Sequence, residues 1–234
     1  MDFLKLIIDG IAYFFKNLPQ YAAILTSLVA ITLFIIKERR ENKKKIADEV
    51  KSAKKLKEEV EAIKIVLGAE AFAIFSQIGF FLDLSEKLKD SVRVKLEVMP
   101  DNLWRQLHIG YDQDNGAYSQ FVMIPNSPTM FDHAFITNAI KLNKDIFDLI
   151  NMLNQAAIAM CKGVDSCIGS AIDNDVSRTR CIVSLMVDGN PASGRNIVKN
   201  ILKGIHPLQK EMSTFGGYSK LSKKINNQYG SNFS

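Results

Sequence analysis

Residues 18–36 read LPQYAAILTSLVAITLFII, and these 19 residues carry no charged side chain. As an α-helix they would span about 28 Å, close to the roughly 30 Å hydrocarbon core of a bilayer. Nine of the residues from 21 to 36 are Leu, Ile, Val or Phe, and each favours insertion by roughly 0.3–0.6 kcal/mol near the bilayer centre. The segment 18–36 is therefore predicted to be a transmembrane helix, with a buried core helix as the alternative.

Basic residues follow this segment directly. Residues 37–45 read KERRENKKK, with six basic side chains against two acidic ones, whereas residues 1–17 contain only Lys5 and Lys16. Cytoplasmic flanks are rich in Lys and Arg, so we expect the N-terminus outside the cell and everything from residue 37 onward in the cytosol. A cleavable signal peptide would have the opposite asymmetry. Six side chains are predicted to set this topology and to contact anionic lipid head groups: Lys37, Arg39, Arg40, Lys43, Lys44 and Lys45.

Residues 1–17 have the pattern of a second membrane element. Charged and apolar residues fall on opposite faces of a helix, which is typical of an amphipathic helix lying in the membrane interface. The alternative is a short inserted helix that forms a hairpin with the segment 18–36. The apolar face consists of Phe3, Leu4, Ile7, Ile8, Ile11, Phe14, Phe15 and Leu18.

Residues 37–67, called the stem below, predict a long basic helix. Its apolar residues recur with a mean spacing of 3.5, the period of a coiled coil, and those expected to mediate self-association are Val50, Val60, Ile63 and Leu67. The alternative is a solvated helix whose apolar stripe packs on its own domain. Nucleic-acid binding is not expected here, because no aromatic residue lies between Phe34 and Phe72 to stack on bases.

A mainly helical cytosolic domain is predicted for residues 68–212, with Gly68 ending the stem. The uncharged run 71–82 is too short for a typical span and is expected to be a buried helix, with a second membrane span as the alternative. Alternation in 91–98 favours a strand, although a helix face also fits, and 118–124 could pair with it. Asp101 is expected to cap a short helix that includes Leu107.

The remaining segments are predicted as follows. Ser127 and Pro128 suit the start of a helix running to about Cys161. Residues 179–187 fit either a strand or a buried helix, and 192–210 fit a last amphipathic helix. Residues 213–234 are predicted to be a flexible tail, because we find no apolar periodicity there.

No chemical motif stands out. The three histidines, His108, His133 and His206, are scattered, and Asp132 beside His133 is more typical of a helix cap than of an acid–base pair. The odd number of cysteines does not suit a disulfide framework, and they lack the spacing of a zinc site: Cys161, Cys167 and Cys181. We therefore predict no catalytic residue, no cofactor and no metal.

The sequence thus predicts a mainly α fold: a single-pass transmembrane anchor, a helical stem and a helical cytosolic domain with at most a small two-stranded β element. The leading hypothesis is a non-enzymatic, membrane-anchored interaction or effector protein in the cell membrane, which self-associates and binds an unidentified protein partner. One alternative is a membrane-active, pore-forming or bilayer-perturbing effector that uses its N-terminal helices. The other is a membrane-tethered enzyme, for which a deep polar pocket is expected.

Overall fold

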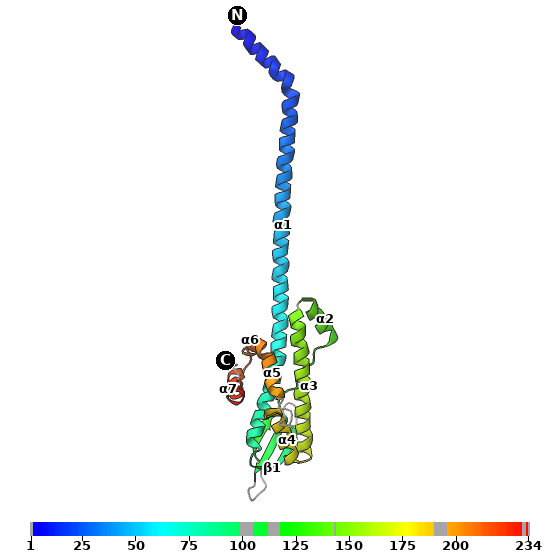
Figure 1. The fold of residues 1–234 in the computed structure, drawn as a ribbon, viewed down its shortest axis with the longest axis vertical. Helices are drawn as coiled ribbons and strands as arrows, with labels where there is room; N and C mark the ends of the chain where they lie inside the picture. Colours follow the sequence, from blue (N-terminus) through cyan, green and yellow to red (C-terminus); the bar gives the residue numbers. More distant parts are fainter. Residues whose placement is uncertain are drawn as a thin grey trace. The chain divides into compact units, whose positions relative to one another are not determined.

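The computed structural model describes residues 2–98, 105–111, 118–142, 144–189, 196–230 and 233. Within them the chain is mainly helical and contains one small antiparallel sheet of three strands, so the prediction of a mainly helical fold is confirmed. The chain divides into two units, Met1–Glu58 and Glu59–Ser234. The second unit, called the domain below, contains the sheet and the later helices, which gather around the C-terminal part of the first helix (Figure 1).

Helix α1 runs from Asp2 to Lys87. The helix continues through the boundary expected between residues 17 and 18, and it also continues through Gly68. A Cβ atom at Gly68 would collide with the side chain of Glu211. This glycine therefore permits close approach of the C-terminal segment, although glycine in a helix interior costs about 1 kcal/mol relative to alanine.

Two apolar stretches of α1 have opposite surroundings. The run 71–82 lies in the core of the domain, where Ile74, Phe75 and Phe81 are buried, as expected for a core helix. Residues 26–59 are exposed at every position. By length and composition, the helix Thr26–Lys87 could cross a membrane, but 61% of its most apolar 18-residue window is buried. That window therefore belongs to the C-terminal stretch and not to residues 26–36.

The sheet consists of β1 (Ser91–Val98), β2 (Arg105–Tyr111) and β3 (Tyr118–Met123), in the order β1-β2-β3. Both expected strands are present, but they flank a third strand instead of pairing with each other. The prediction of a short helix that includes Leu107 is wrong, because residues 105–111 form β2. Asp101, the expected cap of that helix, lies outside the described residues. In β2 the apolar Leu107 and Ile109 alternate with polar residues, which is the pattern of a strand with one buried face.

Two helices replace the single helix expected between residues 128 and 161: α2 (His133–Leu142) and α3 (Lys144–Ile172). The first starts late because the backbone before it has other partners: Thr129 N–H donates to Glu70 Oε2 at 2.6 Å, and Phe131 N–H donates to Asn154 Oδ1 at 3.1 Å. The expected cap is confirmed, since Asp132 Oδ1 accepts from Phe135 N–H at 2.7 Å.

Helix α3 continues past Gly163, where Met186 Cε and Phe81 Cζ would each lie 3.0 Å from an added Cβ. Residues 179–187, which fitted either a strand or a helix, belong to helix α4 (Val176–Val187). The side chain of Asp175 caps α4 by accepting from Arg178 N–H at 2.8 Å. The apolar positions in this stretch therefore serve a helix packed against α3.

The C-terminal region is more ordered than the sequence suggested. The expected helix over 192–210 is divided into α5 (Ile197–Ile205), the 3-10 turn η1 (His206–Leu208) and α6 (Gln209–Met212). The prediction of a flexible tail at 213–234 is wrong, because it contains α7 (Tyr218–Tyr229). Its apolar residues form a helical stripe that the sequence analysis overlooked: Tyr218, Leu221, Ile225 and Tyr229.

Aromatic contacts hold this region against α1. The ring of Phe75 lies 5.5 Å from that of Tyr218 and 5.1 Å from that of Phe233, while Phe72 stacks on Phe215 at 5.1 Å. Such pairs contribute beyond the burial of their apolar area. The C-terminal region is therefore part of the core of the domain.

Replacing Ile225 with Ala should lower the free energy of unfolding of the domain by about 2–5 kcal/mol, because Ile225 is completely buried and the change leaves a cavity. Urea denaturation of the purified protein measures this. The control is Lys223→Ala on the exposed face of α7, which should change stability by no more than about 0.5 kcal/mol. Equal stability of the two variants would contradict the docking of α7.

Candidate functional site

The six basic residues predicted to set topology all lie exposed on α1 within the first unit: Lys37, Arg39, Arg40, Lys43, Lys44 and Lys45. Lys37 is 3.9 Å from Glu41 in an i, i+4 ion pair, and both side chains are more than half exposed. Exposed pairs of this kind contribute little to stability. The charges of this segment are therefore accessible to anionic groups outside the chain.

The four residues predicted to mediate self-association do not share one free surface. Leu67 is completely buried in the core of the domain, and Val60 and Ile63 are partly buried against that core. Only Val50 is well exposed. The position of Leu67 on the heptad stripe coincides with the start of the buried face of α1.

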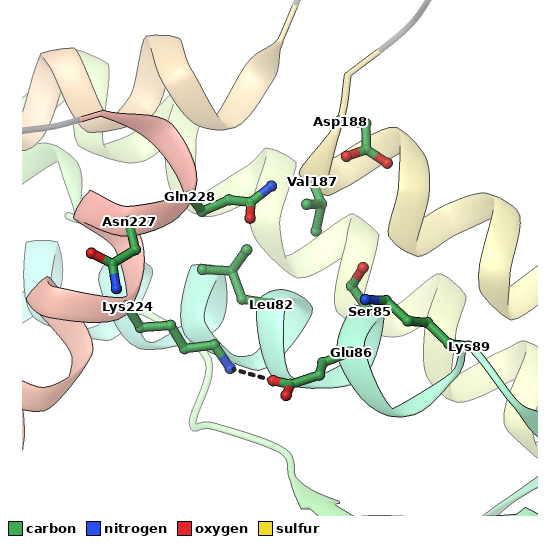
Figure 2. Close-up of a pocket in the computed structure, with 9 residues that line it drawn as sticks. All are labelled: Leu82, Ser85, Glu86, Lys89, Val187, Asp188, Lys224, Asn227 and Gln228. Carbon is green, nitrogen blue, oxygen red and sulfur yellow. Dashed lines mark ion pairs between the residues drawn. The ribbon is translucent and has the colours of Figure 1, made fainter.

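A polar pocket of about 550 Å³ lies within the domain, where the C-terminal ends of α1, α4 and α7 come together (Figure 2). The end of α1 supplies Leu82, Ser85 and Glu86, the end of α4 supplies Val187 and Asp188, and α7 supplies its polar face. The complete lining is Leu82, Ser85, Glu86, Lys89, Val187, Asp188, Lys224, Asn227 and Gln228.

Lys224 is the central charge of this pocket. Its ammonium group pairs with Asp83 and lies 3.7 Å from Glu86 Oε2. Helix C-termini carry a partial negative charge, so lysines are favoured where α1, α4 and α7 end. Lys224 and Lys89 thus balance the carboxylates and the helix ends, and the pocket presents both signs of charge.

The edge of the pocket formed by the end of α4 is held by Tyr229. Its hydroxyl donates to the carbonyl oxygen of Val187 at 3.1 Å. Burial, and secondarily the negative charge of Asp188, raises the pKa of Tyr229 well above its usual value. The hydroxyl therefore remains protonated at neutral pH and keeps this hydrogen bond.

The pocket is suited to binding a small polar molecule through its amide, hydroxyl, ammonium and carboxylate groups. Its polar side chains come from Ser85 and Glu86 on one helix and from Lys224, Asn227 and Gln228 on another. The described part of the chain contains no cluster of three or more His, Cys, Asp or Glu residues able to hold a metal ion.

The residues that sequence analysis singled out for chemistry lie elsewhere. His108 is in β2, His133 begins α2 and His206 begins η1. The three cysteines are free thiols; burial raises the pKa of the Cys167 thiol to about 12. The pocket residues of α7 were missed because the segment 213–234 was taken as a tail, although the spacing of Lys224, Asn227 and Gln228 places them on one helical face.

Comparison of the chain with protein-family models, with curated proteins and with solved structures finds no match.

The ion pair between Lys224 and Asp83 should contribute less than about 1 kcal/mol, because the two side chains are 31% and 51% exposed and are screened by water. A double-mutant cycle with Lys224→Gln and Asp83→Asn, read out by urea denaturation, measures the coupling. It should fall further at high salt. A salt-independent coupling of several kcal/mol would instead show that the pair is desolvated.

Proposed function

We propose that this chain is a membrane-anchored, non-enzymatic interaction protein. Residues 18–36 cross the cell membrane once, the short N-terminal segment lies outside, and the domain Glu59–Ser234 is presented to the cytosol. The observation that supports this proposal is the contrast between the two apolar stretches of α1. The stretch 71–82 is packed into the core of the domain, whereas residues 26–36 have every side chain exposed.

Exposure of the apolar stretch 26–36 to water is unfavourable. Its large apolar side chains point in all directions around the helix, so packing one face against the domain would leave the others exposed: Leu28, Val29, Ile31, Leu33, Phe34, Ile35 and Ile36. A helix that is hydrophobic all round is typical of a membrane span. A bilayer removes this entire surface from water. The helix itself satisfies its backbone N–H and C=O groups there, because they bond to one another within the segment.

The basic segment supports the orientation. Six exposed cations lie within the nine residues that follow the span, and Lys and Arg in such flanks remain on the cytoplasmic side. They also attract anionic head groups, at about 1 kcal/mol for each residue near the surface. Anionic lipid is thus the proposed partner of residues 37–45.

The domain supports binding more directly than catalysis. Of the residues drawn in Figure 2, Lys224 and Glu86 form the ion pair that is marked, so the pocket presents charges of both signs to a polar ligand. The polarity of the pocket is also the observation that favours the tethered-enzyme alternative. We prefer a binding function, in which the domain binds a partner or a small molecule and α1 transmits that binding towards the membrane.

The membrane-active alternative is favoured by the N-terminal part of α1. The large apolar residues from Phe3 to Phe15 are exposed, including those on both sides of the helix. Such a surface can enter a bilayer or lie in its interface. Deleting residues 2–17 separates the two proposals, because an anchored interaction protein keeps its activity and a bilayer-perturbing protein loses it.

A reporter fused after Ser234 should be cytoplasmic, and one fused before Met1 should be outside. Replacing the six basic residues of 37–45 with Gln should produce a mixture of orientations, because the charge bias that sets topology is removed. Protease protection of membrane vesicles provides the measurement, with Lys199→Gln and Lys203→Gln, both exposed on α5, as the control. An external C-terminus would overturn the single-span proposal.

We also propose self-association through the exposed part of the stem, where Ile46, Val50 and Leu56 form the free portion of the apolar stripe. Val50→Glu and Leu56→Glu together should shift the protein in detergent towards the monomer, because a buried unpaired charge disrupts a short seam. Mass photometry measures the stoichiometry. Lys51→Glu, exposed on the opposite face of the helix, is the control. A mass equal to the monomer before mutation would contradict this proposal.

A further inference from the structure

The sheet has one covered face and one open face. Helices α3 and α4 contact β1, and the side chains that point inward are buried: Val94, Leu107, Ile109 and Val122. The pairing of the strands places the alternate residues together on the other face, since Arg93 pairs with Gly110, Lys95 with His108, and His108 with Phe121. This surface is called the open sheet face below.

Three rings lie side by side on the open sheet face. The His108 ring is edge-on to Tyr118 with 5.9 Å between centroids, and it lies 6.1 Å from Phe121 at an interplanar angle of 31°. Phe121 is 52% exposed, a large fraction for a phenylalanine in a sheet. Its ring is therefore available to a flat apolar group from outside the chain.

Two cations border the same rings. The Arg93 guanidinium carbon lies 4.7 Å from the centroid of Tyr118, and Lys95 Nζ lies 5.9 Å from it. The Arg93 side chain lies across Gly110, where a Cβ atom would collide with it. Nε and Nη2 of Arg93 are buried and, among the described residues, have no hydrogen-bond partner. Because Gly110 has no side chain, the Arg93 guanidinium can lie beside the ring of Tyr118.

The charge of the face is positive. Among the described residues, the strand pairing places one acidic residue on this face, Glu97, whose carboxylate pairs with Lys95 at 3.3 Å and lies 3.1 Å from His108 Nε2. Lys87 adds a further cation at the edge of the sheet, where its ammonium group donates to the carbonyl oxygen of Phe121 at 2.9 Å. Within the described part of the sheet and its edge, the three cations Arg93, Lys95 and Lys87 outnumber the carboxylate of Glu97.

We propose that the open sheet face binds single-stranded nucleic acid. Exposed rings accept unpaired bases by stacking, and cations beside them accept the phosphates, which is the combination that single-strand-binding surfaces use. Unpaired bases are free to stack on these rings, whereas the bases of a duplex are already stacked on one another. The stem lacks aromatic residues, but the sheet brings rings and cations from three strands together.

This inference rests on the proposed function, because it names a partner for the cytosolic domain. The two can fail separately. Oligonucleotide binding is measured on the full chain in neutral detergent, where orientation in a membrane has no influence.

The experiment is fluorescence anisotropy with short labelled single-stranded RNA and DNA of mixed sequence. The protein carries Gln at the six basic positions of residues 37–45, so that this basic cluster does not bind phosphate. Phe121→Ala should weaken binding about tenfold, equivalent to about 1.4 kcal/mol, because a stacked base loses its ring. Lys95→Gln should lower the slope of log affinity against log salt by about 0.7, the value for one phosphate contact with a single strand.

The matched controls are Phe147→Ala, a partly exposed ring on α3, and Lys199→Gln, an exposed lysine on α5; neither should change affinity. Melting curves check that the variants of exposed residues remain folded. Three outcomes would overturn the proposal. They are no oligonucleotide binding by the Gln-substituted chain, a loss of affinity in the α3 and α5 controls equal to that of Phe121→Ala and Lys95→Gln, and tighter binding of duplex than of single strands. Binding of anionic vesicles that depends on Phe121, without oligonucleotide binding, would also overturn it.

Discussion

Burial of the apolar side of α1 from residue 71 to residue 84 is the interaction on which the rest of the domain depends. Elements distant in sequence meet on it: Phe75 contacts Tyr218 and Phe233 from the C-terminal region, while Phe81 lies against α3 near Gly163. Each fully buried side chain of this kind contributes roughly 1.5–3 kcal/mol. Gln77 works against this gain, because its side chain is completely buried and its amide has no hydrogen-bond partner among the described residues.

Hydrogen bonds also hold the C-terminal end of α1 against the domain. Arg180 of α4 donates to the carbonyl oxygens of Leu88, Lys89 and Ser91, and the hydroxyl of Tyr111 donates to that of Lys87. The bond from Tyr111 satisfies a carbonyl group that the end of a helix leaves without a partner. The bonds from Arg180 hold the turn that leads from α1 into β1. They connect the end of α1, which lines the polar pocket, to α4 and to the sheet.

Much of the fold could be predicted where a local pattern has one dominant cause. The strand at 91–98, the buried helix at 71–82 and the cap at Asp132 followed from alternation, run length and residue type. Strand β2 and helix α7 were missed because their apolar positions are few and their neighbours polar. Leu107 and Ile109, or Tyr218 and Ile225, become informative only when the surface that buries them is known. None of the pocket residues was predicted, because they come from three helices far apart in sequence.

By itself the sequence determined that the chain has a long charge-free apolar segment followed by a basic one, since these are properties of consecutive residues. It also determined which segments prefer helices, through periodicity within a single element. Only the tertiary structure decided that Leu67 faces the core, that the C-terminal region docks on α1, and that Arg93, His108, Tyr118 and Phe121 share a face. The physical reason is that burial and pairing are relations between distant segments, so the same apolar stripe or exposed ring has no assigned neighbour until the chain has folded.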